Sequence, residues 1–236
     1  MIHLSVNINK IATIRNARGG HLPDVTQFAI DCQRFGADGI TVHPRPDERH
    51  ITLNDVHSIS DHITTEFNIE GYPDKRYMKM IQEIKPHQAT LVPDPPHVLT
   101  SNNGWNIKAS EETLMPIIDQ LKNIGTRISL FVNADEQSIV EAANIGVDRV
   151  ELYTGPFAEK FVMNPVKAVQ TYTEAAKKAV EMGLEVNAGH DLNLDNLSFF
   201  KDHVLPLSEV SIGHALISDA LYFGIEDTIK RYKNCL

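Results

Sequence analysis

Short apolar runs alternate along the chain with longer amphipathic stretches, and this alternation predicts a repeating strand–helix fold. The predicted strands are residues 2–8, 38–43, 65–70, 88–92, 127–132, 148–152, 183–187 and 208–213. The predicted helices are residues 23–35, 53–63, 74–84, 111–124, 135–144, 164–182, 194–203 and 215–231. Such a regular repeat in a chain of 236 residues is typical of an α/β fold of the (β/α)8 barrel type. A doubly wound open sheet is the alternative.

Glycine residues stand where several predicted helices end. Gly36, Gly125, Gly146 and Gly183 each follow an amphipathic stretch and precede an apolar run. Glycine readily adopts the left-handed conformation that closes a helix at its C-terminus, so we expect helix ends at these positions. No stretch rich in Pro, Gly or Ser divides the chain, and we therefore expect one barrel domain over residues 1–236.

Within the predicted strands, apolar and polar residues alternate, which assigns the two faces of the sheet. The apolar set, suited to the face that packs against helices, is Leu4, Val6, Ile8, Ile40, Val42, Phe67, Ile69, Val150, Leu152, Leu184 and Val186. The alternate set, expected inside the barrel, is Ser5, Asn7, Thr41, His43, Asn68, Glu70, Arg149, Glu151, Glu185 and Asn187. Polar groups are costly to bury unless they are paired or used. Those near the C-terminal ends of the strands therefore predict an active site, because barrel enzymes place theirs at that face.

Composition and charge narrow the classes of function. Hydrophobic residues make up 42% of the chain, enough for a packed core, and the net charge of −9 argues against a nucleic-acid surface. Cys32 and Cys235 are too few for a disulfide framework, which favours a reducing cytoplasm. The segment "MIHLSVNINK" lacks the pattern of a signal peptide, and no apolar stretch is long enough to span a membrane.

Two basic segments follow the first two predicted strands. "NKIATIRNARGG" (9–20) carries Lys10, Arg15 and Arg18, and we predict that it is a loop. Either its basic side chains are all solvated, or at least one arginine points at a bound anion. Arg18 is the preferred arginine because the two glycines after it would let the loop fold over the barrel mouth. "VHPRPDERHI" (42–51) carries His43, Arg45 and His50, a group suited to grip a phosphate.

Candidate acid and base groups stand at other strand ends. Glu70 and Glu151 would be either members of ion pairs or proton-transfer groups with tuned pKa values. "EVNAGHDLN" (185–193) and "EVSIGHALI" (209–217) both pass from a strand to a glycine and a histidine, namely His190 and His214. Such junctions present backbone N–H groups that can bind phosphate, and two of them close in sequence suggest one site.

The segment "VPDPPHVLTSNNGW" (92–105) is long for a connection between a strand and a helix. Either it is a surface loop without a function, or it is a lid over the catalytic face, where the Thr100 hydroxyl could reach a phosphate.

Other chemistries have less support in the sequence. His43 and Glu70 could bind zinc, but no HxH or HExxH pattern accompanies them, so we expect no metal. Neither GxGxxG nor a P-loop pattern occurs, which removes the support for nucleotide binding. The predicted strand interiors hold no lysine, which argues against a Schiff-base aldolase.

Taken together, the motifs resemble those of the pyridoxine 5′-phosphate synthase family of vitamin B6 biosynthesis. The matching segments, in order, are "VNINKIATIRNARG", "GADGITVHPRPDERHI", "LVPDPP…T", "SLFVNADEQ", "VELYTG", "VNAGHDLN" and "SIGHALI". The resemblance implies a (β/α)8 barrel, usually an octamer, of the transferase class. It implies the condensation of 1-deoxy-D-xylulose 5-phosphate with 3-amino-2-oxopropyl phosphate to pyridoxine 5′-phosphate, with loss of phosphate and water and without a cofactor.

The resemblance also implies residue roles. Asn7 and Arg18 would bind the amino-ketone phosphate, and Asn9, Lys10, Arg45, His50 and Thr100 would bind the deoxyxylulose phosphate. His43 and Glu70 would accept protons, His190 would donate one, and Glu151 would support them. Gly213 and His214 would join a phosphate cradle, to which Asp191 would offer its backbone N–H.

The chain departs from the family pattern at two places. It has Asn9-Lys10 where the family has Asp-His, and Asp191 where the family has Gly. Lys10 does not titrate near neutral pH, so a proton-transfer role at this position is in doubt. The Asp191 carboxylate must point away from the phosphate or cap the next helix. A sugar-phosphate isomerase built on a barrel and a non-catalytic phosphate-binding protein are the alternative functions.

Overall fold

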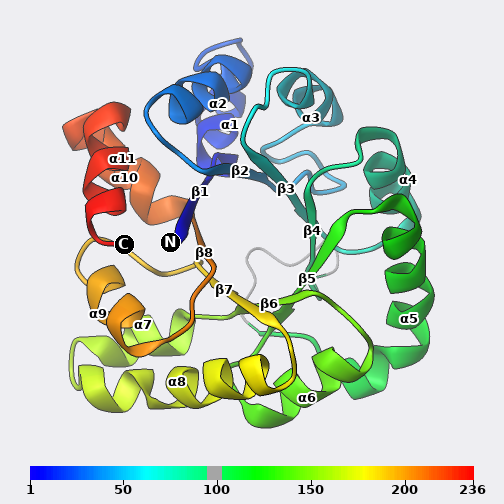
Figure 1. Cartoon of the computed structure of the whole chain (residues 1–236). Coiled ribbons are helices and arrows are strands. Elements are labelled where there is room, and N and C mark those ends of the chain that lie inside the picture. Colours follow the sequence, from blue (N-terminus) through cyan, green and yellow to red (C-terminus); the bar gives the residue numbers. More distant parts are fainter. Residues whose placement is uncertain (95–102) are drawn as a thin grey trace.

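The computed structural model of the chain describes residues 1–94 and 103–236, and its strands form a closed, parallel, eight-stranded barrel in sequence order. Figure 1 shows the ring of strands surrounded by the helices. The strands are β1 (His3–Asn7), β2 (Gly39–Val42), β3 (Glu66–Gly71), β4 (Gln88–Leu91), β5 (Arg127–Val132), β6 (Arg149–Leu152), β7 (Glu185–Ala188) and β8 (Glu209–Ile212). The predicted barrel is therefore confirmed, and the open sheet is excluded because β1 pairs with β8.

The helices lie outside the barrel and cover its outer face. They are α1 (Asn9–Asn16), α2 (Val25–Arg34), α3 (Leu53–Ser60), α4 (Lys75–Ile84), α5 (Ile107–Ile124), α6 (Glu136–Asn144), α7 (Gly155–Phe161), α8 (Pro165–Glu181), α9 (Leu197–His203), α10 (His214–Phe223) and α11 (Ile225–Asn234). Gly36, Gly125, Gly146 and Gly183 all have positive φ angles at helix ends, as expected. No helix of the described residues is long and apolar enough to cross a membrane.

Three predictions about helices were wrong. The basic segment 9–20, predicted to be a loop, begins with helix α1, whose Arg15 forms an ion pair with Asp55 and a hydrogen bond to the carbonyl of His50. A short helix, α7, follows β6 where none was predicted. The predicted helix 215–231 is two helices, because Gly224 between them has a φ of 75°. These differences depend on contacts and backbone angles that apolar periodicity does not report.

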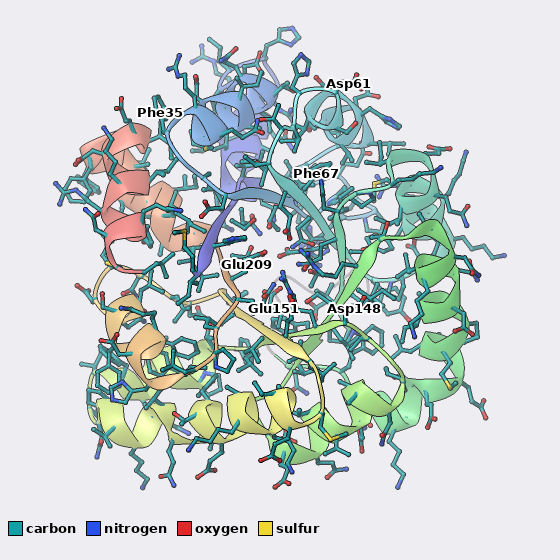
Figure 2. The ribbon with its side chains drawn as sticks, viewed as in Figure 1. Phe35, Asp61, Phe67, Asp148, Glu151 and Glu209 are labelled. Atoms are coloured by element: carbon teal, nitrogen blue, oxygen red, sulfur yellow. The ribbon has the colours of Figure 1, made fainter. Side chains whose placement is uncertain are left out.

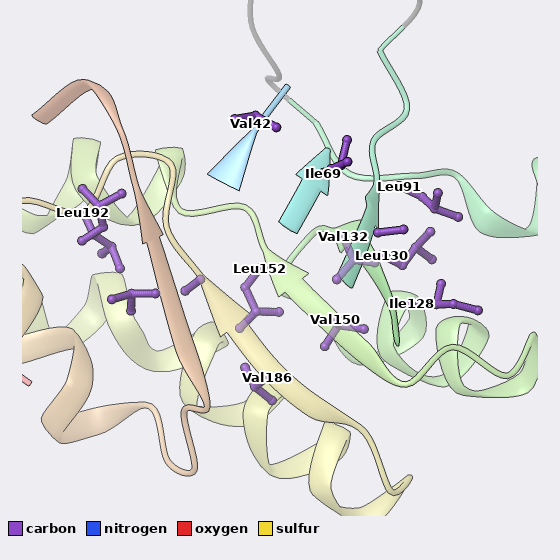
Figure 3. Packing of buried hydrophobic residues seen from close by; sticks show 14 of the residues in the cluster. Val42, Ile69, Leu91, Ile128, Leu130, Val132, Val150, Leu152, Val186 and Leu192 are labelled. Carbon is purple, nitrogen blue, oxygen red and sulfur yellow. The ribbon is translucent and has the colours of Figure 1, made fainter. Parts of the chain in front are cut away.

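The apolar faces of the strands pack against the helices and form the core. Val42, Ile69, Leu91, Val150 and Val186 are almost entirely buried, and Figure 3 shows them on the outer side of the strands. The sequence alternation therefore assigned the outer face correctly. Ile8 is buried as well, but it lies beyond the end of β1, at the start of α1.

The barrel interior is polar along its whole depth, and not only near the C-terminal ends of the strands. At mid-depth, the Thr41 Oγ1 atom contacts Ser5 Oγ at 2.7 Å and accepts hydrogen bonds from Asn68 and Ser211. Glu151 and Glu209 point into the ring of strands, whereas Phe35 and Asp61 lie at the periphery (Figure 2).

An ionic cluster fills the N-terminal end of the barrel. Arg149 forms ion pairs with Glu185 and Glu209 and donates to Gln88 at 2.9 Å. Arg127 forms an ion pair with Glu66. These charges largely neutralise one another, so polarity inside the barrel does not by itself locate the active site.

Candidate active site

A cavity of about 440 Å³ lies at the C-terminal ends of the strands. Its lining is Asn7, Asn9, Lys10, His43, Arg45, His50, Glu70, Val92, Phe131, Glu151, His190, Asp191, Ser211, Gly213 and His214. Described residues from β1 to the start of α10 thus face one space at the C-terminal end of the barrel, where the sequence placed the site. Of the predicted site residues that the structure describes, Arg18 is not in this lining. Arg18 follows α1 and is exposed, and Thr100 lies outside the described residues.

Asn7, Asn9 and His43 form a chain of hydrogen bonds from β1 to β2. The His43 backbone N–H donates to Asn9 Oδ1 at 2.8 Å, and the Asn9 backbone N–H donates to Asn7 Oδ1 at 3.1 Å. Asn7 Nδ2 in turn lies 3.4 Å from Glu70 Oε2, to which it donates. The two asparagines, predicted as substrate-binding residues, therefore also hold the proton-transfer groups in place.

Glu70 and His43 are both buried, and burial shifts their pKa values toward their neutral forms. Burial raises the pKa of Glu70 to about 7, although the nearby Arg45 and the hydrogen bond from Asn7 oppose the rise. Burial also lowers the pKa of His43 well below its ordinary value, and the charge of Arg45 followed by the interaction with His50 adds to this effect. His43 Nδ1 lies 3.8 Å from Glu70 Oε2. At neutral pH the pair therefore consists of an uncharged His43 imidazole and a Glu70 carboxyl group that is close to half-ionised.

Glu151 is the second buried carboxyl group in the cavity. Burial, and next the charge of Glu70, raise its pKa to about 8. Within the described residues its buried Oε2 atom has no hydrogen-bond partner. A carboxyl group with these properties is protonated at neutral pH and can hold a proton for transfer.

Cationic and donor groups line the β1–β2 side of the cavity. Arg45 is buried, and its Nη2 atom lies 3.7 Å from Asp94 Oδ2. His50 Nδ1 accepts the backbone N–H of Ile51 at 2.9 Å, so its proton lies on Nε2. Burial and then the charges of Arg45 and Lys10 lower the pKa of His50 to about 4, which leaves the imidazole neutral. This side of the cavity can thus offer two charged groups and a neutral N–H donor to an anion.

The two strand–glycine–histidine junctions lie side by side, because β7 pairs with β8. A Cβ atom at Gly189 would lie 1.9 Å from the carbonyl oxygen of Ser211, and one at Gly213 would lie 3.1 Å from the Cβ of Asn7. Packing against β8 therefore requires glycine at position 189, whereas at position 213 a Cβ would make only a tight contact with Asn7. Both junctions were expected to present backbone N–H groups to a phosphate, but Gly189 is not in the cavity lining. Gly213 and His214 do line it, at the N-terminus of α10, where backbone N–H groups favour an anion.

Of the two positions expected for the Asp191 side chain, the cap of the next helix is wrong. The side chain does not cap α9, because the N-cap residue of that helix is Asn196. Its Oδ2 atom lies 2.7 Å from Nδ1 of His190, and its backbone N–H donates to Thr154 Oγ1 at 3.2 Å. Burial, the largest influence, lowers the pKa of His190, but the hydrogen bond and charge of Asp191 together with Glu151 and Asp94 outweigh it, and the pKa is raised.

The sequence reasoning missed three residues of the lining, namely Val92, Phe131 and Ser211. Each stands at an interior position of its strand or just beyond the strand's end, two residues from another interior residue. The alternation rule would have found them if it had been applied to β4, β5 and β8 as well as to the other strands.

No group of three or more His, Cys, Asp or Glu side chains within residues 1–94 and 103–236 is arranged to hold a metal ion. His43 and Glu70, the pair considered for zinc, contact each other without a third candidate ligand in that part of the chain.

Comparisons with known proteins show the family to which the chain belongs. The sequence model of the family described as "Pyridoxal phosphate biosynthesis protein PdxJ" matches residues 4–236. The chain is 56% identical over 236 residues to the pyridoxine 5′-phosphate synthase of Bacteroides thetaiotaomicron, with all of both chains covered. It is 54% identical to the enzyme of the same name from Porphyromonas gingivalis, covering 100% of this chain and 99% of that one.

Among solved structures, a monomeric form of phosphoribosylanthranilate isomerase from Thermotoga maritima has a TM-score of 0.62. It covers 100% of this chain and 98% of its own at 14% identity, so this likeness shows the barrel fold alone. The family match and the identity to the two synthases extend over nearly the whole sequence. The chain therefore belongs to the family of the pyridoxal phosphate biosynthesis protein PdxJ.

Proposed function

We propose that this chain is a pyridoxine 5′-phosphate synthase that condenses 1-deoxy-D-xylulose 5-phosphate with 3-amino-2-oxopropyl phosphate. The products are pyridoxine 5′-phosphate, inorganic phosphate and water. One observation carries the proposal: a single cavity contains two carboxyl groups with pKa values near neutrality and two histidines whose pKa values are shifted in opposite directions. Ring closure between an amine and ketones needs several proton transfers, and this set can perform them near neutral pH.

The two ends of the cavity suit two phosphorylated substrates. Lys10, Arg45 and the N–H of His50 stand on the β1–β2 side, and the N-terminus of α10 stands on the β8 side. We assign Asn9, Lys10, Arg45, His50 and Thr100 to the deoxyxylulose phosphate. Asn7 and Arg18 are assigned to the amino-ketone phosphate. Gly213 and His214 form the phosphate cradle, and the Asp191 backbone N–H would join it only by giving up its hydrogen bond to Thr154 Oγ1. Arg18 would have to approach the cavity when substrate binds.

Each proton-transfer group has a role that follows from its charge state. His43 is neutral and can accept a proton as the substrate amine attacks a ketone. Glu70, close to its midpoint, can accept the next proton and release it. His190 has a raised pKa and can protonate a hydroxyl group as it leaves as water. Glu151 holds a further proton in the same buried space.

These groups act without a metal or an organic cofactor in this proposal. Acid–base catalysis supplies about 10²–10⁴-fold in rate for each positioned group. Holding two substrates in one cavity contributes further by orienting the reacting atoms. Residues 1–236 act as one catalytic domain with the active site at the C-terminal face of the barrel.

We also propose that the protein works as a homo-octamer in the cytoplasm, with no nucleic acid or membrane as a partner. Large apolar side chains that a monomer would leave in water support the assembly. They include Val162, Met163, Val166, Leu221 and Tyr222, each of them more than two-thirds exposed. Cys32 and Cys235 are free thiols, as is usual in a reducing compartment.

The test is a turnover assay with both phosphorylated substrates, followed by the absorbance of a new pyridine ring and by phosphate release. We expect product only when both substrates are present. An isomerase would instead convert one substrate alone, and a binding protein would retain both without turnover. Either result would overturn the proposal.

A further inference from the structure

The carboxylate of Asp191 contacts the imidazole of His190 at the cavity wall. The Oδ2 and Nδ1 atoms are 2.7 Å apart, and both side chains line the cavity. We propose that Asp191 is a positioning residue, which orients His190 and stabilises its charged form so that the imidazole can donate a proton. This inference rests on the proposed function, in which His190 is the proton donor.

The backbone of Asp191 is held on both sides. Its N–H donates to Oγ1 of the buried Thr154, and its carbonyl oxygen accepts from Asn196 Nδ2 at 3.2 Å. The next residue, Leu192, is fully buried and donates its N–H to the carbonyl of Gly189 at 2.7 Å, which closes a tight turn. The carboxylate therefore extends from an anchored backbone to the neighbouring ring.

Other groups face His190 from the strands packed around it. Tyr153 at the end of β6 makes an edge contact with the ring, with centroids 5.8 Å apart. Burial lowers the pKa of His190, whereas the hydrogen bond and the charge of Asp191 raise it. The charges of Glu151 and Asp94 act in the same direction as Asp191 but rank after it. Asp191 is thus the largest of the influences that keep the imidazole charged.

The contact also selects the nitrogen that transfers the proton. When Nδ1–H donates to the carboxylate, Nε2 carries the proton that can be given to a substrate oxygen. An imidazolium paired in this way remains charged at higher pH than an unpaired one. The family pattern has glycine at this position, so the pairing would be a property of chains that carry aspartate there.

Two variants separate the contributions of Asp191. Asp191→Asn keeps the size and an acceptor oxygen but removes the charge, and Asp191→Gly removes the side chain. Asp195→Asn, on the same loop and exposed, is the matched control. The His190 imidazole is titrated by NMR in each protein, and the His190→Asn variant identifies its resonance among the 11 histidines. The pH profile of kcat is measured as well. It cannot isolate His190 on its own, because Glu70 and Glu151 titrate in the same pH range, and the NMR titration supplies that assignment.

We expect the titration of His190 to move to lower pH in Asp191→Asn and Asp191→Gly and to stay in place in Asp195→Asn. At pH 8, kcat should fall about tenfold in Asp191→Asn and stay within about twofold at pH 6, with no increase in KM. Unchanged titration of His190 in both Asp191 variants would overturn the inference. So would a shifted titration with an unchanged pH profile. A wild-type protein without turnover would refute the proposed function instead, while the NMR titration would still decide whether the two side chains are paired.

Discussion

Replacing Glu151 by glutamine tests whether the barrel holds this carboxyl group in its protonated form. Glutamine has nearly the same size as a protonated glutamic acid but cannot ionise. Glu151 is buried, and burial followed by the charge of Glu70 raises its pKa from 4.5 to about 8. The folded protein therefore keeps a proton at neutral pH that the unfolded chain releases. For this reason the contribution of Glu151 to stability is greatest at low pH and decreases as the pH rises from about 4.5 to 8.

The magnitude follows from the size of that shift. Each pH unit between the unfolded and folded pKa values changes the free energy of unfolding by about 1.4 kcal/mol. As the pH rises from 4.5 to about 8, the free energy of unfolding of the wild-type protein should thus decrease by up to about 5 kcal/mol relative to that of Glu151→Gln. At pH 4.5 the two proteins should be similar, and at pH 9 the variant should be the more stable. Its turnover should nevertheless fall, because it can no longer supply the proton.

The assay is urea unfolding at pH 4.5, 7 and 9, with the free energy of unfolding compared between variant and wild type at each pH. The other buried carboxyl groups, Glu70 and Glu209, are present in both proteins, but they interact with Glu151, so the difference measures the titration of Glu151 together with its coupling to them. Glu112→Gln, an exposed position on α5, is the control and should show no pH-dependent difference. If the Glu151→Gln difference were the same at all three pH values, the carboxyl group would not be held protonated and this reasoning would be refuted.

Three further predictions concern the site and the barrel. His190→Asn should lower turnover by about 10²–10⁴-fold with little change in substrate affinity; a collapse of affinity with turnover preserved at saturation would make His190 a binding residue. Gly189→Ala should destabilise the fold by roughly 3 kcal/mol or more, since its Cβ would lie 1.9 Å from the Ser211 carbonyl oxygen. Thermal unfolding measures this effect against Gly20→Ala, where a Cβ meets no atom within 4 Å, and equal melting temperatures would contradict it. Extensive chelation should leave turnover unchanged, because no three-ligand cluster occurs in residues 1–94 and 103–236; loss of activity that one divalent ion restores would disprove this.

The sequence by itself determined the barrel and the side on which the cavity lies. Alternation within strands such as β3 and β6 separates an apolar outer face from a polar inner face, because successive side chains of a strand point in opposite directions. Parallel strands in one barrel end at the same face, so polar residues at the strand ends must meet there. The alternation identifies His43, Glu70 and Glu151, the strand–glycine–histidine junction identifies His190, and all four line one cavity.

Only the tertiary structure decided which polar groups are paired and which can serve a substrate. Arg149, an interior residue by alternation, belongs to an ionic cluster at the opposite end of the barrel. Arg15 forms an ion pair with Asp55, whereas Arg18 is exposed outside the cavity. The Asp191 carboxylate contacts His190, although one expectation was that it would cap a helix. These outcomes depend on contacts between side chains and on how far each charge is removed from water. Local sequence patterns specify the direction of a side chain, but its partners and its solvation are properties of the folded chain.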